Sequence, residues 1–295
     1  MDYRDEVFIA VAENLSFSKA AEELFISQPA VTKHIKELES KLNIALFERK
    51  GNKIYLTKAG KMAYRQLKHI KEQYRDLEFE LGRLNDTFRG SLRLGASSTI
   101  SQYIIPCVLA AFHQRYPKIN LSLLNGNSSQ MEQKLVNNEI DLALVENDSS
   151  HTNIRYIDFL DDEIIVVTGS ASVYSKRKNM TLTDIQQIPI VLREWGSGTL
   201  EVIQHAFARQ NIDLEKLNIT IHLGSTEAIK NFLTNFEGIG LVSEKSIEKE
   251  LQLKSLQKIN VKDFNIYRKL RIAQRQGPDA KIPTLFREFL FQYNF

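Results

Sequence analysis

The first sixty residues predict two short helices around a tight turn, followed by a β-hairpin. Val31, Ile35 and Leu38 recur at helical spacing and predict the buried stripe of a helix that begins near Ser27. The Ser27 hydroxyl can accept a hydrogen bond from an N–H of the first turn, and proline at position 29 is tolerated there. We therefore expect a helix-turn-helix whose second helix has one free face.

That free face is polar and basic. Gln can read adenine, Thr can touch a thymine methyl, and Lys can reach guanine or phosphate. Gly51-Asn52 lies between two strand-like runs and predicts a hairpin wing with basic residues at its tip. The candidate DNA-binding residues are Ser27, Gln28, Pro29, Thr32, Lys33, Lys36, Arg49, Lys50 and Lys53.

The alternative is an ordinary amphipathic helical pair with a solvated outer face. Local charge favours DNA, because residues 31–68 hold ten basic and three acidic residues, a net of +7, whereas the whole chain carries +3. Positive charge is therefore concentrated where a phosphate backbone would lie.

A second apolar pattern follows, with alternating spacings of four and three residues over three heptads. This pattern predicts a helix of about 30 residues, roughly 45 Å long, that pairs with a second copy of the chain. The alternative is a helix that lies on the core of its own domain. The seam residues, which we expect to mediate dimerisation, are Ala63, Leu67, Ile70, Tyr74, Leu77, Leu81 and Leu84.

From Ser91 onward, strand-like runs alternate with helical patterns such as 108–116, 131–137 and 200–210. This alternation predicts α/β units with largely parallel sheets, in which ligands bind beyond the carboxyl ends of the strands. The expected strands are 92–96, 121–124, 141–145, 163–167, 188–192, 219–223 and 240–242.

The strand-to-helix loops of this region are rich in Ser, Thr and Gly. Helix N-termini favour anions, and small hydroxyl side chains add donors without bulk. For any single loop, capping of a helix is the competing interpretation, but four such loops favour a site for a small anion. They are 97–99, 125–129, 196–199 and 224–226. Arg193 could pair with the anion or with Glu194 or Glu201.

Composition limits the other possibilities. Hydrophobic residues make up 43% and charged residues 25% of the 295, the balance of an ordinary soluble protein, and there is no apolar run of transmembrane length or signal peptide. We expect a cytoplasmic protein without membrane contact. Its single cysteine, Cys107, lies among apolar residues and is expected to be a buried structural thiol.

Catalytic and metal-binding patterns are not found. The six histidines form no ligand pair, and no nucleophile elbow or nucleotide-binding glycine motif occurs, so we predict no catalytic residues, no metal and no cofactor. The acidic run 161–163 could suggest a metal site but is expected to be a solvated turn.

A long ordered set of motifs resembles the N-terminal domain of LysR-type transcriptional regulators. These motifs are Val7-Phe-Ile-Ala-Val-Ala-Glu13, Ser16-Phe17, Ala20-Ala21, Ser27-Gln-Pro-Ala-Val31, Leu46-Phe-Glu-Arg49 and Leu56-Thr-Lys-Ala-Gly60. The resemblance implies an all-α winged helix-turn-helix domain at 1–58 and a linker or dimerisation helix at 59–89. It also implies an α/β effector-binding domain at 90–295, similar to periplasmic binding proteins, with subdomain I at 90–161 and 265–295 and subdomain II at 162–264.

In that layout a small effector binds between the two subdomains. The residues that the resemblance places at this cleft are Ser97, Ser98, Thr99, Ser197, Thr199, Ser225 and Thr226. Asn127 and Glu146, at the ends of their strands, and Arg193 are further candidates for effector binding. The segment 193–199 is similar to one in regulators of sulfur assimilation and carbon fixation, although Trp195 departs from that pattern.

We therefore expect a DNA-binding transcription regulator that responds to a small anionic metabolite, with sulfur metabolism and central carbon metabolism as the two candidate sources. The resemblance implies a homodimer or homotetramer on a pseudo-palindromic double-stranded promoter site, together with RNA polymerase. Two alternatives remain: a small-molecule-binding protein or enzyme with a DNA-binding fusion, and a DNA binder that needs no ligand.

Overall fold

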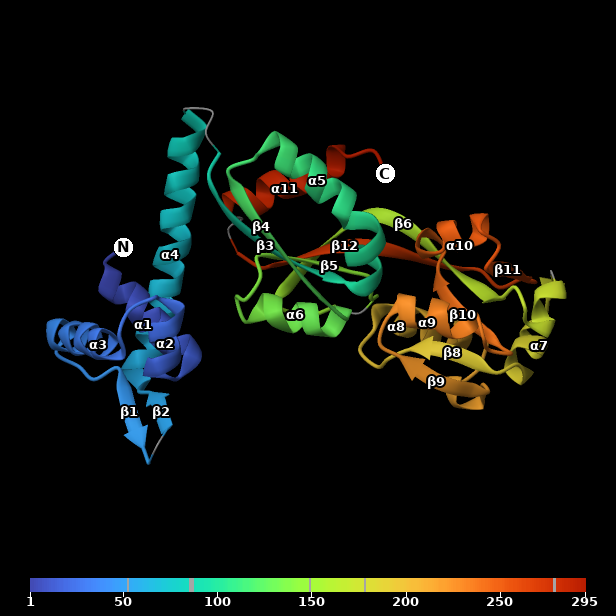
Figure 1. The fold of residues 1–295 in the computed structure, drawn as a ribbon, viewed down its shortest axis with the longest axis horizontal. Coiled ribbons are helices and arrows are strands. Elements are labelled where there is room, and N and C mark those ends of the chain that lie inside the picture. Colours follow the sequence, from blue (N-terminus) through green and yellow to red (C-terminus); the bar gives the residue numbers. More distant parts are fainter. Residues whose placement is uncertain (52, 85–87, 149, 178, 278–279) are drawn as a thin grey trace. The chain divides into compact units, whose positions relative to one another are not determined.

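The computed structural model describes residues 1–51, 53–84, 88–148, 150–177, 179–277 and 280–295. The chain forms two compact units, Met1–Thr87 and Phe88–Phe295 (Figure 1). Each unit has its own apolar core. The domain boundaries expected from the sequence stay predictions, because the second unit is compact as a whole.

The first unit packs short helices and a hairpin around one core. Val7, Phe8, Val11, Ala20 and Val31 are fully buried in it. The predicted helix pair, hairpin and long helix are confirmed. The elements are α1 (Tyr3–Asn14), α2 (Phe17–Glu23), α3 (Gln28–Leu42), β1 (Phe47–Lys50), β2 (Lys53–Leu56) and α4 (Lys58–Leu84).

Local signals fix the ends of α3. The Ser27 hydroxyl accepts from the backbone N–H of Ala30, which satisfies one of the free donors of the first turn. At the other end Asn43 takes a left-handed conformation, φ 51°, which Asn tolerates better than most residues. The predicted N-cap is therefore confirmed.

The second unit is an α/β unit built on one large sheet. Its strands are β3 (Gly90–Ser97), β4 (Ile119–Gly126), β5 (Leu142–Val145), β6 (Ile154–Gly169), β7 (Asn179–Met180), β8 (Ile190–Arg193), β9 (Ile219–Leu223), β10 (Ile239–Ser243), β11 (Leu256–Val261) and β12 (Ile266–Arg275). Its α-helices are α5 (Ile105–Arg115), α6 (Ser128–Val136), α7 (Leu182–Gln187), α8 (Gly198–Arg209), α9 (Thr226–Leu233), α10 (Glu248–Gln252) and α11 (Lys281–Gln292), and a π-helical turn spans Ile100–Ile104.

The strand order divides the sheet into two sets of parallel strands. The order is β4-β3-β5-β12-β6-β10-β8-β9, with β11 beside β6 and β7. Strands β3, β4 and β5 are parallel to one another and form the first strand set, while β8, β9 and β10 are parallel and form the second. Helices α5 and α11 lie on one face of the first set and α6 on the other (Figure 1).

The centre of the sheet differs from the sequence prediction. Strands β6 and β12 are antiparallel to each other and join the two strand sets, so the expectation of largely parallel sheets is confirmed only for the sets themselves. The acidic run 161–163 was expected from the sequence to be a turn, and this expectation was wrong. The run lies within β6, opposite Tyr267–Lys269 of β12. Strand β12 and the first part of β6 escaped prediction, whereas the expected strand 163–167 lies within β6. In β12 a charged residue, Arg268, occupies an inward position and interrupts the apolar pattern.

Cys107 is a second correction, because it is exposed and not buried. It lies on α5, whose buried side is formed by Ile105, Val108 and Phe112. Apolar neighbours in sequence do not place a residue on the buried side of a helix, since position on the 3.6-residue period decides this. No helix in the described part of the chain is long and apolar enough to cross a membrane.

Candidate nucleic-acid interface and anion site

The recognition helix α3 presents a polar surface opposite its buried stripe. Val31, Ile35 and Leu38 are buried against the unit core. On the free side, the Gln28 amide donates to the Thr32 hydroxyl at 3.1 Å, and that hydroxyl donates to the Gln28 carbonyl. The two side chains therefore hold each other on the surface where a base edge would be read.

The lysines of α3 are available to a phosphate backbone. Lys33 is 76% exposed and lies 3.9 Å from Glu37, a loose surface pair of little energetic weight. Lys36 is exposed, as are Ser27, Gln28 and Pro29 at the start of the helix. The structure brings these predicted residues together on one face.

The hairpin wing carries the remaining basic candidates. Strands β1 and β2 pair antiparallel, with Lys50 opposite Lys53. Arg49 and Lys53 line a hollow of about 300 Å³ beside Ser16 and Phe17 at the start of α2. Residue 52, the second residue of the predicted turn, lies outside the described residues. Two basic side chains, Arg49 and Lys53, therefore lie at one hollow of the wing.

The long helix α4 divides the predicted seam into two parts. Ala63 and Leu67 pack against the core of their own unit, as the alternative interpretation expected. Ile70, Tyr74, Leu77 and Leu81 are 41–54% exposed, although they are large and apolar. The side chain of Leu84 lies outside the described residues. An exposed apolar stripe of this length is typical of a helix that pairs with another chain.

The candidate anion site lies at the ends of parallel strands. Ser97 closes β3, Glu146 follows β5 and Arg193 closes β8, while Ser197 and Thr199 begin α8. Because β5 pairs with β3 in parallel, their carboxyl ends meet at one edge. All five side chains are 2% exposed or less.

Arg193 links the two strand sets. Its guanidinium donates to the Ser98 hydroxyl at 2.7 Å and to the Thr226 hydroxyl at 3.4 Å. It also pairs with the adjacent Glu194 at 2.8 Å. The sequence left the partner of Arg193 open, and the structure gives it Glu194 together with hydroxyls from both sets.

Glu146 lies on the other side of the same site. Its Oε1 accepts from the Thr199 hydroxyl at 2.7 Å. Its Oε2 lies 3.3 Å from a terminal nitrogen of Arg268 but accepts no hydrogen bond from any described residue. Burial alone would raise the pKa of Glu146, but the charges of Arg268 and Arg193 hold it below its ordinary value. Glu146 is therefore an ionised acceptor that Thr199, Arg268 and Ser97 surround.

Three hydroxyls at the site are buried without a partner. Among the described residues, the hydroxyls of Ser97, Thr99 and Ser197 make no hydrogen bond. A buried hydroxyl without a partner costs about 1–3 kcal/mol, and such groups are expected where a ligand completes them. Ser197 occupies the N-cap position of α8 without a side-chain cap bond, so the first-turn N–H groups face the same region.

Two predicted residues serve the helices instead. Asn127 accepts from the backbone N–H of Gln130 and so caps α6. Ser225 accepts from the N–H of Ala228 and caps α9. The capping interpretation therefore accounts for these two side chains, and their place in an anion site stays a prediction.

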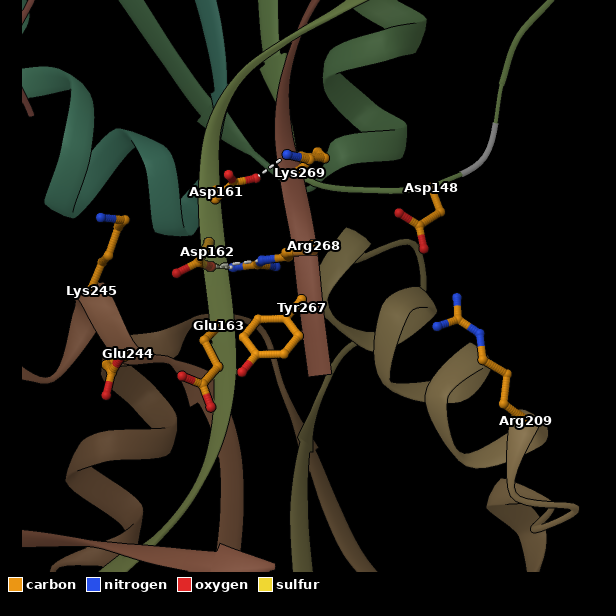
Figure 2. Close-up of a pocket in the computed structure, with 10 residues that line it drawn as sticks. All are labelled: Asp148, Asp161, Asp162, Glu163, Arg209, Glu244, Lys245, Tyr267, Arg268 and Lys269. Atoms are coloured by element: carbon orange, nitrogen blue, oxygen red, sulfur yellow. Dashed lines mark hydrogen bonds and ion pairs between the residues drawn. The ribbon is translucent and has the colours of Figure 1, made fainter. Parts of the chain in front are cut away.

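Arg268 and Asp162 were not predicted from the sequence. The Arg268 side chain is completely buried, donates to Asp162 at 2.8 Å and to Thr199 at 3.0 Å, and thereby connects the central strands to the anion site. Asp162 also accepts from Ser243 at 2.7 Å. Figure 2 shows Asp162 and Arg268 pointing toward each other between β6 and β12.

The same pair borders a larger hollow along the central strands. This hollow has a volume of about 720 Å³ (Figure 2). It is lined by Asp148, Asp161, Asp162, Glu163, Arg209, Glu244, Lys245, Tyr267, Arg268 and Lys269. No group of three or more His, Cys, Asp or Glu suited to a metal ion occurs among the described residues.

Comparison with known proteins gives two family matches. The model described as "LysR substrate binding domain" matches residues 85–293, and "Bacterial regulatory helix-turn-helix protein, lysR family" matches residues 5–61. One match falls in each compact unit, and residues 62–84 lie outside both.

Individual relatives match over nearly the full length. The "Probable RuBisCO transcriptional regulator" of Thalassiosira pseudonana is 34% identical over 288 residues, which cover 96% of this chain and 93% of the relative. The "HTH-type transcriptional activator CmpR" of Synechocystis sp. is 32% identical over 290 residues, covering 98% and 94%. Among solved structures, the Synechocystis CcmR regulatory domain in complex with 2-PG is 30% identical, with a TM-score of 0.63, and covers 69% of this chain and 97% of that domain.

Proposed function

The chain belongs to the LysR family of transcriptional regulators, and from this premise we propose the residues through which it binds DNA and senses its effector. Members of this family bind DNA through the helix-turn-helix, form oligomers and carry an effector-binding domain. The proposed DNA contacts are Ser27, Gln28, Pro29, Thr32, Lys33, Lys36, Arg49, Lys50 and Lys53, which are gathered on α3 and the hairpin.

One observation carries the effector site. The buried Arg193 guanidinium joins Ser98 to Thr226 across the two strand sets, next to the unpartnered hydroxyls of Ser97, Thr99 and Ser197. A fixed cation, free donors and a helix N-terminus are the elements that bind small anions. We propose that a small anion is bound here and that it favours one arrangement of the two strand sets over another.

The relatives support a choice of metabolite class. The CcmR domain was solved in complex with 2-PG, and the Thalassiosira relative is named for RuBisCO regulation. We propose that the effector of this chain is likewise a small anion of central carbon metabolism; the sulfur alternative has less support among these three relatives.

We further propose that the protein acts on a pseudo-palindromic promoter in the cytoplasm, together with RNA polymerase, and catalyses no reaction. The exposed part of the α4 seam is the proposed dimer contact. The alternative of a small-molecule-binding protein or enzyme fused to a DNA-binding domain is not needed, because both family matches describe parts of LysR-type regulators. The alternative of a regulator that needs no ligand predicts that no small anion stabilises the chain in the following test.

The test is a thermal-shift titration of the full chain with small carboxylates and phosphates. Ser97→Ala and Ser197→Ala are the sharpest variants, because each removes a hydroxyl that has no partner in the described structure and so costs the free protein little. We expect a saturable rise in melting temperature that both variants weaken and that Ser122→Ala, at an exposed position on β4, leaves unchanged. Equal responses in all four proteins would contradict the site.

A further inference from the structure

The loop before helix α8 is in direct contact with the first strand set. The backbone N–H of Ser129, in the first turn of α6, donates to the carbonyl oxygen of Gly196 at 3.3 Å. The first N–H groups of a helix find no partner within the helix, so the bond of Ser129 is made across the two strand sets. The two sets therefore meet through backbone atoms beside the candidate anion site.

Gly198, the first residue of α8, lies closer still to the first strand set. A β-carbon at this position would lie 2.5 Å from the backbone nitrogen of Asn147, 2.7 Å from the hydroxyl oxygen of Ser128 and 2.8 Å from the carbonyl carbon of Glu146. Real β-carbons essentially never approach another heavy atom within 3.0 Å. Two of these three atoms belong to the backbone that follows β5, so they cannot turn aside as the end of a flexible side chain can.

The backbone conformation of Gly198 does not itself require glycine. Gly196 has a φ of 86°, in the left-handed region that favours glycine, whereas Gly198 begins a right-handed helix, in which other residues are more favourable than glycine. The missing side chain at position 198 therefore provides space, and that space is filled by the first strand set.

This contact accompanies the hydrogen bonds that join the two sets at the anion site. Thr199, the next residue of the chain, donates to Glu146 at 2.7 Å, and Arg193 donates to Ser98 at 2.7 Å. Ser197 lies directly before Gly198 and is 2% exposed. A ligand can reach so deeply buried a hydroxyl only when the two sets separate, so the contact at Gly198 belongs to the closed state of the site.

We infer that Gly198 is a positioning residue, whose missing side chain allows the two strand sets to close on each other over the anion site. A side chain at this position holds the sets apart and admits water. The donors of the two sets then no longer converge on an anion, and water screens the charge of Arg193. The role in anion binding rests on the proposed anion site, whereas the contact itself can be tested without any ligand.

Gly198→Ala is the test, and Gly224→Ala is the matched control. Both glycines lie where a strand of the second set leads into a helix, but a β-carbon at Gly224 would meet no atom within 4 Å. Hydrogen exchange is measured by mass spectrometry on the full chain without added anion. We expect the Ser129 amide to exchange about tenfold faster or more in Gly198→Ala, because its partner lies on the other set. It should exchange at the unchanged rate in Gly224→Ala.

Ser128→Thr enlarges the same contact from the side of the first set. Threonine keeps the hydroxyl that accepts from the backbone N–H of Glu146 at 3.4 Å, and it adds a methyl group to a side chain that is 1% exposed. Threonine is an ordinary residue in a helix. If Gly198→Ala fails to fold, this variant still tests whether added volume at the contact separates the two sets.

The single tryptophan and the single cysteine of the chain measure the separation of the two sets. Trp195 lies in the loop before α8 and is 67% exposed, and Cys107 is exposed on α5, which covers the first set. Energy transfer from Trp195 to a dye on Cys107 should fall in Gly198→Ala and in Ser128→Thr and should stay unchanged in Gly224→Ala. An excess of unlabelled chain with Trp195→Phe and Cys107→Ser removes transfer between copies from the signal.

The outcomes distinguish this inference from the proposed anion site. Unchanged exchange of the Ser129 amide together with unchanged energy transfer in Gly198→Ala and Ser128→Thr would overturn the role of Gly198. If no small anion stabilises the unchanged chain, the proposed anion site fails, while exchange and energy transfer still decide whether Gly198 lets the sets close. Inorganic phosphate that stabilises Gly198→Ala as strongly as the unchanged chain would show that anion binding does not need this contact, and would also overturn the inference.

Discussion

Tyr103 and Glu227, which are 124 residues apart in sequence, join the two strand sets: the phenolic hydroxyl of Tyr103 donates to Oε1 of the Glu227 carboxylate at 2.5 Å. Tyr103 lies in the π-helical turn after β3, and Glu227 lies in α9 beside β8 and β9. Lys230 pairs with Glu227 at 2.8 Å and places its ammonium 4.8 Å from the centre of the Tyr103 ring. Burial and the Glu227 carboxylate raise the pKa of Tyr103 well above its ordinary value, so the hydroxyl stays a donor.

Removal of this hydroxyl should loosen the contact between the strand sets. Tyr103→Phe keeps the ring and the cation–π contact but deletes the hydrogen bond to a charged acceptor. We expect the free energy of unfolding to fall by about 1–2 kcal/mol, measured by urea denaturation, and hydrogen exchange in α9 to accelerate.

Tyr156→Phe is the control for that prediction. Tyr156 donates to Glu132 at 2.6 Å, a bond of the same chemistry that connects β6 with α6. This variant should lose similar stability without faster exchange in α9. Identical exchange patterns in the two variants would show that Tyr103 does not hold α9.

Much of the site could be predicted because its residues lie at strand ends, and strand ends follow from apolar runs bounded by Ser, Thr and Gly. Ser97 and Thr199 were found in such strand-to-helix loops, Glu146 was placed by the family resemblance, and Arg193 was a candidate with its partner left open; in the structure Arg193 contacts Ser98 and Glu146 contacts Thr199. Arg268 was not found, because it lies at an inward position of β12, where a charged side chain hides the alternating pattern that marks a strand. Its partner Asp162 was hidden in an acidic run that resembles a turn.

The α4 seam illustrates the other limit of sequence patterns. The heptad spacing is continuous from Ala63 to Leu84, yet Ala63 and Leu67 cover the core of their own unit, and Ile70 to Leu81 do not. Spacing shows which residues share a face of a helix; it does not show what covers that face.

Two residues of the recognition helix α3 should affect DNA binding in different ways. Lys33→Ala should weaken promoter binding and lower its salt dependence, because the exposed ammonium is placed to neutralise a phosphate. Gln28→Ala should cost about 1–3 kcal/mol on the specific site and little on random DNA. Fluorescence anisotropy over a salt series distinguishes the two effects.

Lys41→Ala is the matched control for Lys33→Ala. Lys41 is 58% exposed at the other end of α3, where it lies 3.8 Å from Asp2. It should leave promoter affinity within about twofold of the unchanged chain, since surface ion pairs contribute little. Equal losses for Lys33 and Lys41 would indicate a general charge effect and would contradict the assignment of the recognition surface.

The exposed part of the seam should control oligomeric state. Leu77→Asp introduces a charge at a position that is 51% exposed in the single chain, so it should not disturb the unit core but should prevent close pairing of two helices. Light scattering should report a smaller species. Met62→Asp makes the same kind of change at a residue that is 59% exposed and off the seam, and it should keep the oligomer. An intact oligomer in Leu77→Asp would remove the seam as the contact.

Acid should destabilise the second unit through Glu146. Its folded-state pKa is lowered below the ordinary value of 4.5, since the opposing effect of burial is outweighed by the charges of Arg268 and Arg193. A group with a lowered pKa stabilises the folded state above its unfolded pKa, and that contribution is lost as the pH falls through the folded value. We therefore expect the free energy of unfolding to decrease below about pH 5, measured by urea denaturation between neutral and acidic pH.

Glu146→Gln should be less stable at neutral pH but should show a smaller further loss on acidification. Glu215→Gln, at an exposed position, should follow the unchanged chain at every pH. A parallel pH dependence in Glu146→Gln and the unchanged chain would mean that other carboxylates govern the acid response.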